Sequence, residues 1–226
     1  MKHLLKLLDC STEEIIGLLD LADQLKYEKK HNISHRHLEG KSLGMIFQKS
    51  STRTRVSFET GMYQLGGQAL FLSNRDLQIG RGEPVQDTAR VLSRYLDGIM
   101  IRTYEQKEVE DLANYGSIPV INGLTDFCHP CQVLADLMTI REKFAVLEGI
   151  KMCYIGDGNN MANSLIVGGL KTGMKVSIAT PEGYRPHAEV MAFAEGNPDF
   201  FITDDPMKAA ENADVVITDT WASMGM

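Results

Sequence analysis

Short apolar runs alternate with helix-like stretches along almost the whole chain, and this alternation limits the possible folds more than any other feature. The apolar runs have the length of buried strands, and the stretches between them carry apolar residues at helical spacing. Strands separated by helices pair in parallel through right-handed crossovers, with helices covering both faces of the sheet. The sequence therefore predicts an α/β fold built on parallel sheets.

The pattern divides into two halves, because the alternation restarts after a long helix. Strands are predicted at residues 43–47, 68–72, 98–102, 118–121, 151–155, 175–179, 200–203 and 215–218. Helices are predicted from the capping-box sequence Ser11-Thr-Glu-Glu14 onward, from Pro84 onward, and at residues 53–65, 105–114, 129–144, 161–171, 186–194 and 206–212. We expect two domains, 1–145 and 146–226, joined by the helix 129–144. Because the chain stops just past its last strand, we expect the second domain to be incomplete.

Composition excludes several classes of partner. The 226 residues include 23 basic and 30 acidic side chains, a net charge of −7, so neither nucleic acid nor an anionic membrane is expected. The leucines before Cys10 imitate a lipoprotein signal, but Lys6 and Asp9 interrupt them, and we expect a helix entry there. With four cysteines and no apolar window of about 20 residues, the chain is predicted to be soluble and cytoplasmic.

The densest polar cluster, Ser50-Ser-Thr-Arg-Thr-Arg55, falls between a predicted strand and a predicted helix. Ser and Thr cap helices, and the N–H groups of a helix N-terminus attract anions. Arg53 and Arg55 add forked donors that match phosphate oxygens. The cluster predicts a phosphate site, although a capped helix start with solvated arginines would give the same pattern. A nucleotide P-loop is excluded, because the chain has no G-x-x-x-x-G-K-[ST].

A second cluster, His129-Pro-Cys-Gln132, lies at the predicted start of the long helix. A neutral imidazole beyond the end of a strand can donate to a carbonyl oxygen, and Gln132 offers an amide one turn further on. A structural histidine is the alternative. Cys128 and Cys131 form a C-x-x-C, but a zinc site would need a second ligand pair, so neither a metal site nor a redox function is expected.

The segment Tyr154-Ile-Gly-Asp-Gly-Asn-Asn160 follows a predicted strand and begins a helix, as dinucleotide-binding loops do. It lacks the third glycine of G-x-G-x-x-G, and no acidic residue ends the next predicted strand. Asn159, Asn160 and Asn163 favour a small polar ligand over a pyrophosphate. A nicotinamide-dependent dehydrogenase is therefore the less favoured alternative, and no cofactor is expected.

Five motifs, in chain order, resemble the aspartate/ornithine carbamoyltransferase family. They are S-T-R-T-R at 51–55, I-R-T at 101–103, H-P-C-Q at 129–132, G-D-G-N-N at 156–160 and D-T-W-A-S-M-G at 219–225. The resemblance covers the whole chain. It implies that domain 1–145 binds carbamoyl phosphate and that a Rossmann-like domain, 146–226, binds ornithine. It further implies transfer of the carbamoyl group to the side-chain amine of L-ornithine, which gives L-citrulline and phosphate.

The resemblance also implies roles for individual residues. Those implied to bind carbamoyl phosphate are Ser51, Thr52, Arg53, Thr54, Gln78, Arg102, His129 and Gln132. As catalytic residues, Arg102 would bridge the phosphate and the carbonyl oxygen, His129 would donate to that oxygen, and Gln132 would hold the carbamoyl amine. Those implied to hold the α-amino and α-carboxylate groups of ornithine are Asn163, Asp219, Ser223 and Met224.

Gln78 lies in a loop, 73–83, that in the family reaches the active site of a neighbouring subunit, so the resemblance implies a homotrimer or a multiple of trimers. The family continues past S-M-G to an H-C-L-P motif whose cysteine contacts the side-chain amine of ornithine, and this chain stops at Met226 before that motif. Two alternatives stay open: a carbamoyltransferase that uses putrescine or a modified ornithine, and a non-catalytic fragment that only binds carbamoyl phosphate.

Overall fold

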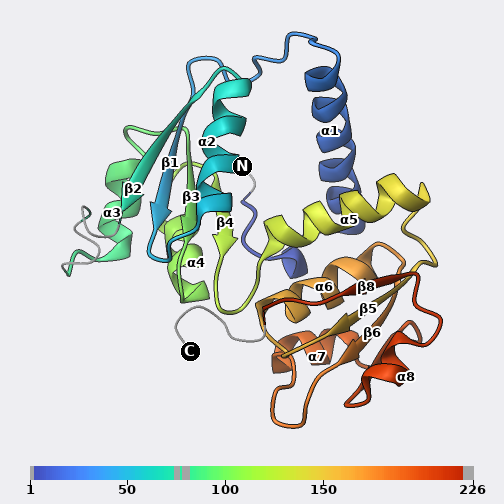
Figure 1. Cartoon of the computed structure of the whole chain (residues 1–226). Coiled ribbons are helices and arrows are strands. Elements are labelled where there is room, and N and C mark those ends of the chain that lie inside the picture. Colours follow the sequence, from blue (N-terminus) through green and yellow to red (C-terminus); the bar gives the residue numbers. More distant parts are fainter. Residues whose placement is uncertain (1–2, 74–76, 78–81, 221–226) are drawn as a thin grey trace. The chain divides into compact units, whose positions relative to one another are not determined.

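The structure, a computed structural model, describes residues 3–73, 77 and 82–220. The chain forms two compact units (Figure 1). Unit 1 comprises Met1–Leu5 and Leu21–Asp126, and unit 2 comprises Lys6–Asp20 and Phe127–Met226. The polypeptide therefore passes between the units three times. Each unit contains a parallel four-stranded sheet with helices, so the predicted α/β class is confirmed.

In unit 1 the strand order is β2-β1-β3-β4. The elements are β1 Ser42–Phe47, α2 Thr52–Gln64, β2 Gln68–Ser73, α3 Val85–Leu92, β3 Gly98–Arg102, α4 Gln106–Tyr115 and β4 Val120–Leu124. Successive residues of β1 point to opposite faces. Met45 lies in a buried cluster with Met62 of α2. Ile46, the next residue, lies in another cluster with Ala89 of α3 and Leu112 of α4. Helices thus cover both faces, which leaves the carboxyl ends of the strands for a ligand.

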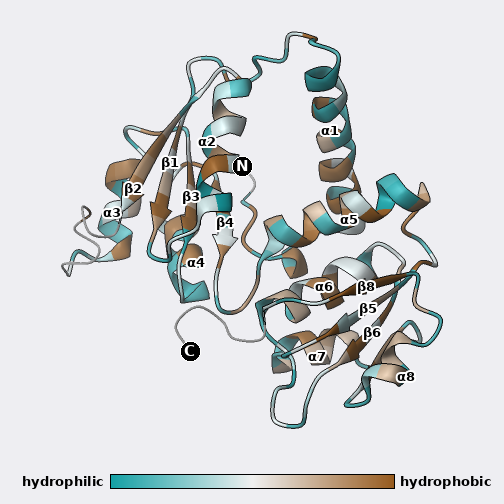
Figure 2. Cartoon of the chain, viewed as in Figure 1, coloured by the Kyte–Doolittle hydropathy of each residue, from teal (hydrophilic) through white to brown (hydrophobic). Residues whose placement is uncertain are grey.

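In unit 2 the strand order is β7-β6-β5-β8. The elements are α5 Pro130–Phe144, β5 Lys151–Ile155, α6 Asn160–Lys171, β6 Lys175–Ala179, α7 Ala188–Ala194, β7 Phe200–Thr203, α8 Pro206–Ala210 and β8 Val215–Ile217. The helix α6 is central to this core, because nine of its residues are buried and Leu165 and Ile166 have no exposed surface. Ser177 of β6 donates to the carbonyl oxygen of Ala209 at 2.7 Å and so holds α8 against the sheet. Figure 2 shows that the central strands of both sheets are mostly hydrophobic.

Two further elements lie near the start of the chain, a 3-10 turn at Leu7–Asp9 and the helix α1 at Thr12–Lys30. The capping box predicted for α1 is present: the Glu14 N–H donates to Ser11 Oγ at 3.2 Å, and the Ser11 N–H donates to the Glu14 carboxylate at 2.7 Å. Within unit 2, Lys171 Nζ donates to three carbonyl oxygens of the turn and of the residue after it, at 2.5–3.0 Å. Among the described residues, no helix is both long and apolar enough to cross a membrane.

Most predicted elements have the expected bounds, and the differences arise from contacts between distant segments. The strands at 98–102, 151–155, 175–179 and 200–203 agree with the structure at both ends. The helix entry predicted for the first ten residues is wrong. Leu4 instead forms a parallel bridge with Ile121, and its N–H donates to the carbonyl oxygen of Val120 at 2.9 Å. This pairing satisfies backbone groups of β4, the edge strand, which begins two residues later than predicted.

Candidate functional site

The N-terminus of α2 lies just beyond the carboxyl end of β1, where an α/β sheet binds its ligands. Ser51 is the N-cap residue, and its Oγ accepts a hydrogen bond from the Thr54 N–H at 3.2 Å. The same oxygen donates to Thr54 Oγ1 at 3.0 Å. Ser51, Thr52, Arg53 and Thr54 therefore surround one helix N-terminus, whose partial positive charge and unbonded N–H groups suit an anion.

Arg102 is the last residue of β3, and its Cα is in register with Phe47 at the end of β1. The residue is only 7% exposed, and its Nε has no hydrogen-bond partner among the described residues. Burial, and after it the positive charge of Arg53, lowers the pKa of the Arg102 guanidinium. A buried cation beside a second cation is costly unless an anion joins them. The structure thus brings Arg53 and Arg102 together within unit 1.

Two further cations of the described part of unit 1, Arg55 and Lys49, are already paired. Arg55, which the sequence suggested as a second phosphate ligand, donates to Glu59 at 2.9 Å, and its guanidinium lies 3.8 Å from the ring centroid of Phe71. Lys49 pairs with Asp126, and its ammonium lies 4.2 Å from the ring centroid of Tyr104. Arg53 and Arg102 are therefore better placed than Arg55 to bind a phosphate.

His129 and Gln132 lie at the start of α5, in unit 2. His129 is the N-cap residue, and its N–H donates to Ser164 Oγ of α6 at 2.8 Å. Pro130, as predicted, occupies the first turn of the helix. Gln132 Nε2 donates to Oδ1 of Asp136 at 2.9 Å. The fixed backbone at His129 and the bonded amide of Gln132 hold both side chains on one rigid helix start.

Asn163 of α6 uses its side chain within the protein. Its Nδ2 donates to the carbonyl oxygen of Phe127 at 2.9 Å, and its Oδ1 accepts from the His187 N–H at 2.9 Å. The residue is only 4% exposed. An amide has two N–H donors and two lone pairs, so one of each is left for a ligand. The structure thus shows Asn163 ordering the segments before α5 and α7, and its contact with ornithine stays a prediction.

Asp219 lies in an acidic group that the sequence did not single out as a unit. Its carboxylate accepts from the Thr220 N–H at 2.8 Å. Burial first, and the charge of Asp219 as a further cause, raises the pKa of Asp136 on α5. The same two causes, with the charge of Asp157, raise the pKa of Tyr154 on β5. The charge of Asp219 thus acts on both Asp136 and Tyr154, and a carboxylate in such a setting is suited to bind an ammonium group.

Asp136, the hydrogen-bond partner of Gln132, is a residue that sequence reasoning missed. The available signal was its position four residues after Gln132, on the same face of a helix. Three predicted site residues, Gln78, Ser223 and Met224, lie outside the described residues.

The C-x-x-C motif has the properties of packed side chains. Cys128 is buried, and burial raises the pKa of the Cys131 thiol to about 12, which disfavours the reactive thiolate. Within the described residues, no group of three His, Cys, Asp or Glu side chains could hold a metal ion.

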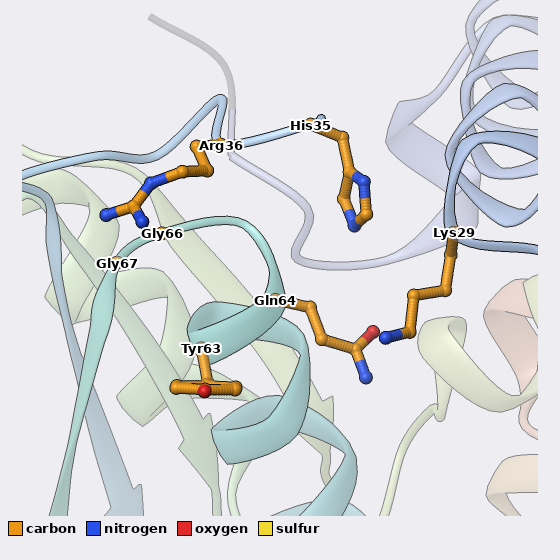
Figure 3. Close-up of a pocket in the computed structure, with 7 residues that line it drawn as sticks. All are labelled: Lys29, His35, Arg36, Tyr63, Gln64, Gly66 and Gly67. Atoms are coloured by element: carbon orange, nitrogen blue, oxygen red, sulfur yellow. The ribbon is translucent and has the colours of Figure 1, made fainter. Parts of the chain in front are cut away.

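A cavity of about 360 Å³ lies elsewhere in unit 1, at the other end of α2 (Figure 3). Its lining residues are Lys29, His35, Arg36, Tyr63, Gln64, Gly66 and Gly67. Figure 3 shows the Arg36 guanidinium directed away from Lys29 and His35, and Arg36 pairs with Glu39 at 3.0 Å. The three basic side chains therefore do not converge on one ligand, and no predicted site residue lines the cavity.

Two family models together match almost the whole chain. Residues 2–142 match the carbamoyl-P binding domain of aspartate/ornithine carbamoyltransferase, and residues 148–226 match its Asp/Orn binding domain. The chain belongs to the aspartate/ornithine carbamoyltransferase family.

Within this family, the proteins to which the chain is similar are named ornithine carbamoyltransferases. The chain is 58% identical to ornithine carbamoyltransferase of Oceanobacillus iheyensis and 56% identical to anabolic ornithine carbamoyltransferase of Pyrococcus furiosus, in each case over 99% of the chain. It spans 71% and 73% of those two proteins. The solved structure of the P. furiosus enzyme matches with a TM-score of 0.95 at 55% identity, over 99% of this chain and 73% of that one. The Thermus thermophilus enzyme matches with a TM-score of 0.90 at 40% identity, over 98% and 75%.

Proposed function

We infer that this chain is an ornithine carbamoyltransferase, which transfers the carbamoyl group of carbamoyl phosphate to the side-chain amine of L-ornithine and forms L-citrulline and phosphate. The observation that carries this inference is the buried Arg102, whose Nε has no partner among the described residues, beside Arg53 and the N-terminus of α2. It lies in the part of the chain that matches a carbamoyl-P binding domain. The curated relatives named above are ornithine carbamoyltransferases.

We propose that the phosphate binds at the start of α2. Ser51, Thr52 and Thr54 would contribute hydroxyl and backbone N–H groups, and Arg53 a forked pair of donors. Gln78, by the resemblance, would come from a neighbouring subunit. Arg102 would bridge the phosphate and the carbonyl oxygen, so that its buried charge is neutralised when the substrate is present. Its low exposure supports this role, because a charge in a dry site stabilises a developing oxyanion more strongly than one in water.

We propose that His129 and Gln132 act on the carbamoyl group. The amine of ornithine attacks the carbonyl carbon, and the negative charge that forms on the carbonyl oxygen is stabilised by His129 together with Arg102. The bond between that carbon and the phosphate oxygen then breaks, and the departing phosphate takes the proton that the amine loses. Gln132 would hold the carbamoyl NH₂ group throughout. Positioning and electrostatic stabilisation suffice, without a covalent intermediate.

We propose that Asp219 pairs with the α-ammonium group of ornithine, with Asn163, Ser223 and Met224 completing the site. The repulsion between Asp219 and Asp136 supports this, because a bound ammonium would relieve it. Putrescine lacks the α-carboxylate that such a site receives.

We also propose a homotrimeric, cytoplasmic enzyme. The edge strand β2 carries exposed Leu70 and Phe71, and α2, which packs against β2, carries exposed Val56 and Tyr63. Exposed apolar side chains on an unpaired edge are typical of a subunit contact. A cytoplasmic location is consistent with a cysteine content too low for a disulfide framework.

The test is an assay of the purified chain with carbamoyl phosphate and one of three acceptors: ornithine, aspartate or putrescine. Citrulline as the only product is the expected result. Carbamoyl-putrescine would favour the alternative acceptor. Binding of carbamoyl phosphate without turnover would favour the non-catalytic fragment.

A further inference from the structure

Gln132 and Asp136 lie one turn apart on α5, and their contact fixes the direction of an amide. Gln132 Nε2 donates to Asp136 Oδ1 at 2.9 Å. A carboxylate offers only acceptors, so the amide turns its NH₂ group toward Asp136 and its Oε1 the other way. In the part of the chain that the structure describes, no group donates to this Oε1. Asp136 therefore leaves Gln132 with one acceptor directed away from the pair.

The proposed role of Gln132 requires this orientation. The carbamoyl nitrogen carries two N–H donors, so it binds to Oε1 and not to Nε2. A glutamine whose amide can rotate presents donors part of the time, and donors facing donors repel. The neighbour that fixes the amide therefore decides which group reaches the substrate.

A second pair in the same chain has the same chemistry and the opposite electrostatics. On α1, Gln24 Nε2 donates to Glu28 Oε1, also at 2.9 Å and also four residues apart. There the hydrogen bond from Gln24 is the main cause of the shift, and it lowers the pKa of Glu28. At Asp136 burial outweighs the bond from Gln132, and the charge of Asp219 adds to the cost. A carboxylate whose ionised form is made unfavourable by burial and by a second carboxylate is characteristic of functional sites rather than of helix stabilisation.

We propose that Asp136 is a positioning residue that holds the Gln132 amide with Oε1 toward the carbamoyl NH₂ group. This inference rests on the proposed function, and Asp136 itself touches neither substrate.

The decisive experiment is a double-mutant cycle with Asp136→Asn and Gln132→Ala, measured as kcat/KM for carbamoyl phosphate at saturating ornithine. Asparagine keeps the size of Asp136 but can donate or accept, so it no longer fixes the amide. The expected loss for Asp136→Asn is about tenfold or more, which corresponds to one charge-assisted hydrogen bond. In the Gln132→Ala background, Asp136→Asn should cause no further loss, because the side chain it positions is gone. Glu28→Gln, the matched change on α1, should stay within about twofold of wild type.

Two results with an active enzyme would overturn the inference while the function stands. One is additive losses in the double mutant, which would mean that Asp136 acts independently of Gln132. The other is a change confined to the KM for ornithine, which would make Asp136 part of the ammonium site with Asp219.

An NMR measurement tests the contact without any turnover. The side-chain NH₂ resonances of Gln132, assigned by their loss in Gln132→Ala, should shift in Asp136→Asn and follow the titration of Asp136 in wild type. The inference would be overturned if these resonances shifted neither in Asp136→Asn nor with the titration of Asp136. If no acceptor gives product, the proposed function fails separately, and this measurement still decides whether Asp136 orients the amide.

Discussion

Arg53 and Arg102 repel each other. At the scale of single residues, we therefore expect that replacing one of them weakens phosphate binding without lowering the stability of the fold. Arg102 is buried and cannot move its charge into water, whereas Arg53 is exposed at the start of α2. A guanidinium stays protonated even when its pKa falls, so the unfavourable energy persists until an anion binds. Phosphate binding should therefore depend on both arginines.

Arg53→Ala is expected to raise the Kd for carbamoyl phosphate at least about tenfold, since a charge-assisted hydrogen bond contributes roughly 1.5–3 kcal/mol. The Tm should not fall, because the repulsion on Arg102 is relieved. Calorimetric titration and thermal unfolding measure the two quantities. Arg55→Ala is the control on the same helix: its side chain pairs with Glu59, and the Kd should stay within about threefold. An unchanged Kd in Arg53→Ala would remove Arg53 from the site.

Asp136 gives a prediction about stability and pH. Burial and the charge of Asp219 raise its pKa above the usual 3.8, so the folded chain holds this proton more tightly than the unfolded chain. Above pH 3.8 the carboxylate therefore costs stability, and the cost grows until the raised pKa is passed. The Tm of Asp136→Asn minus that of wild type should rise between about pH 4 and pH 7. Glu28→Gln should show the opposite slope, because the pKa of Glu28 is lowered. A flat difference for Asp136→Asn would mean that the carboxylate is well solvated.

At the scale of elements, the loop between β5 and α6 depends on close backbone approach at Gly158. Its N–H donates to the carbonyl oxygen of Tyr184 at 2.7 Å. A Cβ at this position would lie 2.2 Å from Pro186 N and 2.3 Å from the carbonyl carbon of Arg185, both main-chain atoms that cannot rotate away. The glycine that suggested a dinucleotide loop is thus needed for packing between two loops of unit 2.

Gly158→Ala is expected to lower the free energy of unfolding by about 2 kcal/mol or more, because two backbone segments must separate. Gly17→Ala on α1 is the control, since its Cβ would meet nothing within 4 Å. In a helix interior it should stabilise by about 0.5–1 kcal/mol. Chemical denaturation measures both changes. Equal, small effects would show that the 182–186 segment can move without cost.

Local patterns predicted the elements well because the strands are compact apolar runs and most helices, though not α4, have a capping side chain or a proline at their start. They failed where a distant segment decides the backbone. The helix α7 was expected from residue 186 but begins at Ala188, after His187, whose N–H donates to Asn163 and whose ring caps the helix by accepting from the Glu189 N–H. Charged and capping residues at the start of α2 could be named from sequence. The unfavourable burial of Asp136 near Asp219 could not be predicted from sequence, because 83 residues separate the two (219 − 136).

At the scale of the whole molecule, the exposed apolar residues of α2 and β2 predict self-association. Light scattering after size exclusion should give three times the 25.1 kDa of one chain, or a multiple of that. Val56→Glu should shift the mass toward the monomer, because Val56 is 53% exposed and a buried, unpaired charge opposes association. Tyr95→Glu is the control, because Tyr95 is also exposed but follows α3 and lies outside α2 and β2. A monomeric wild type would contradict the prediction that Gln78 reaches the active site of a neighbouring subunit.

The contact of Lys171 with the turn at Leu7–Asp9 has a consequence for biosynthesis. Lys171 is 164 residues from Leu7, whose carbonyl oxygen it binds. Leu7 also lies against Gly168 of α6, where an added Cβ would be 3.2 Å from its Cδ1. A ribosome that adds about 5–20 residues per second needs roughly 8–30 s to add those 164 residues. During this interval Leu7, which is buried in the finished fold, has been translated while the part of α6 against which it packs has not. The nascent chain thus presents this leucine to chaperones before its native packing partner has been made.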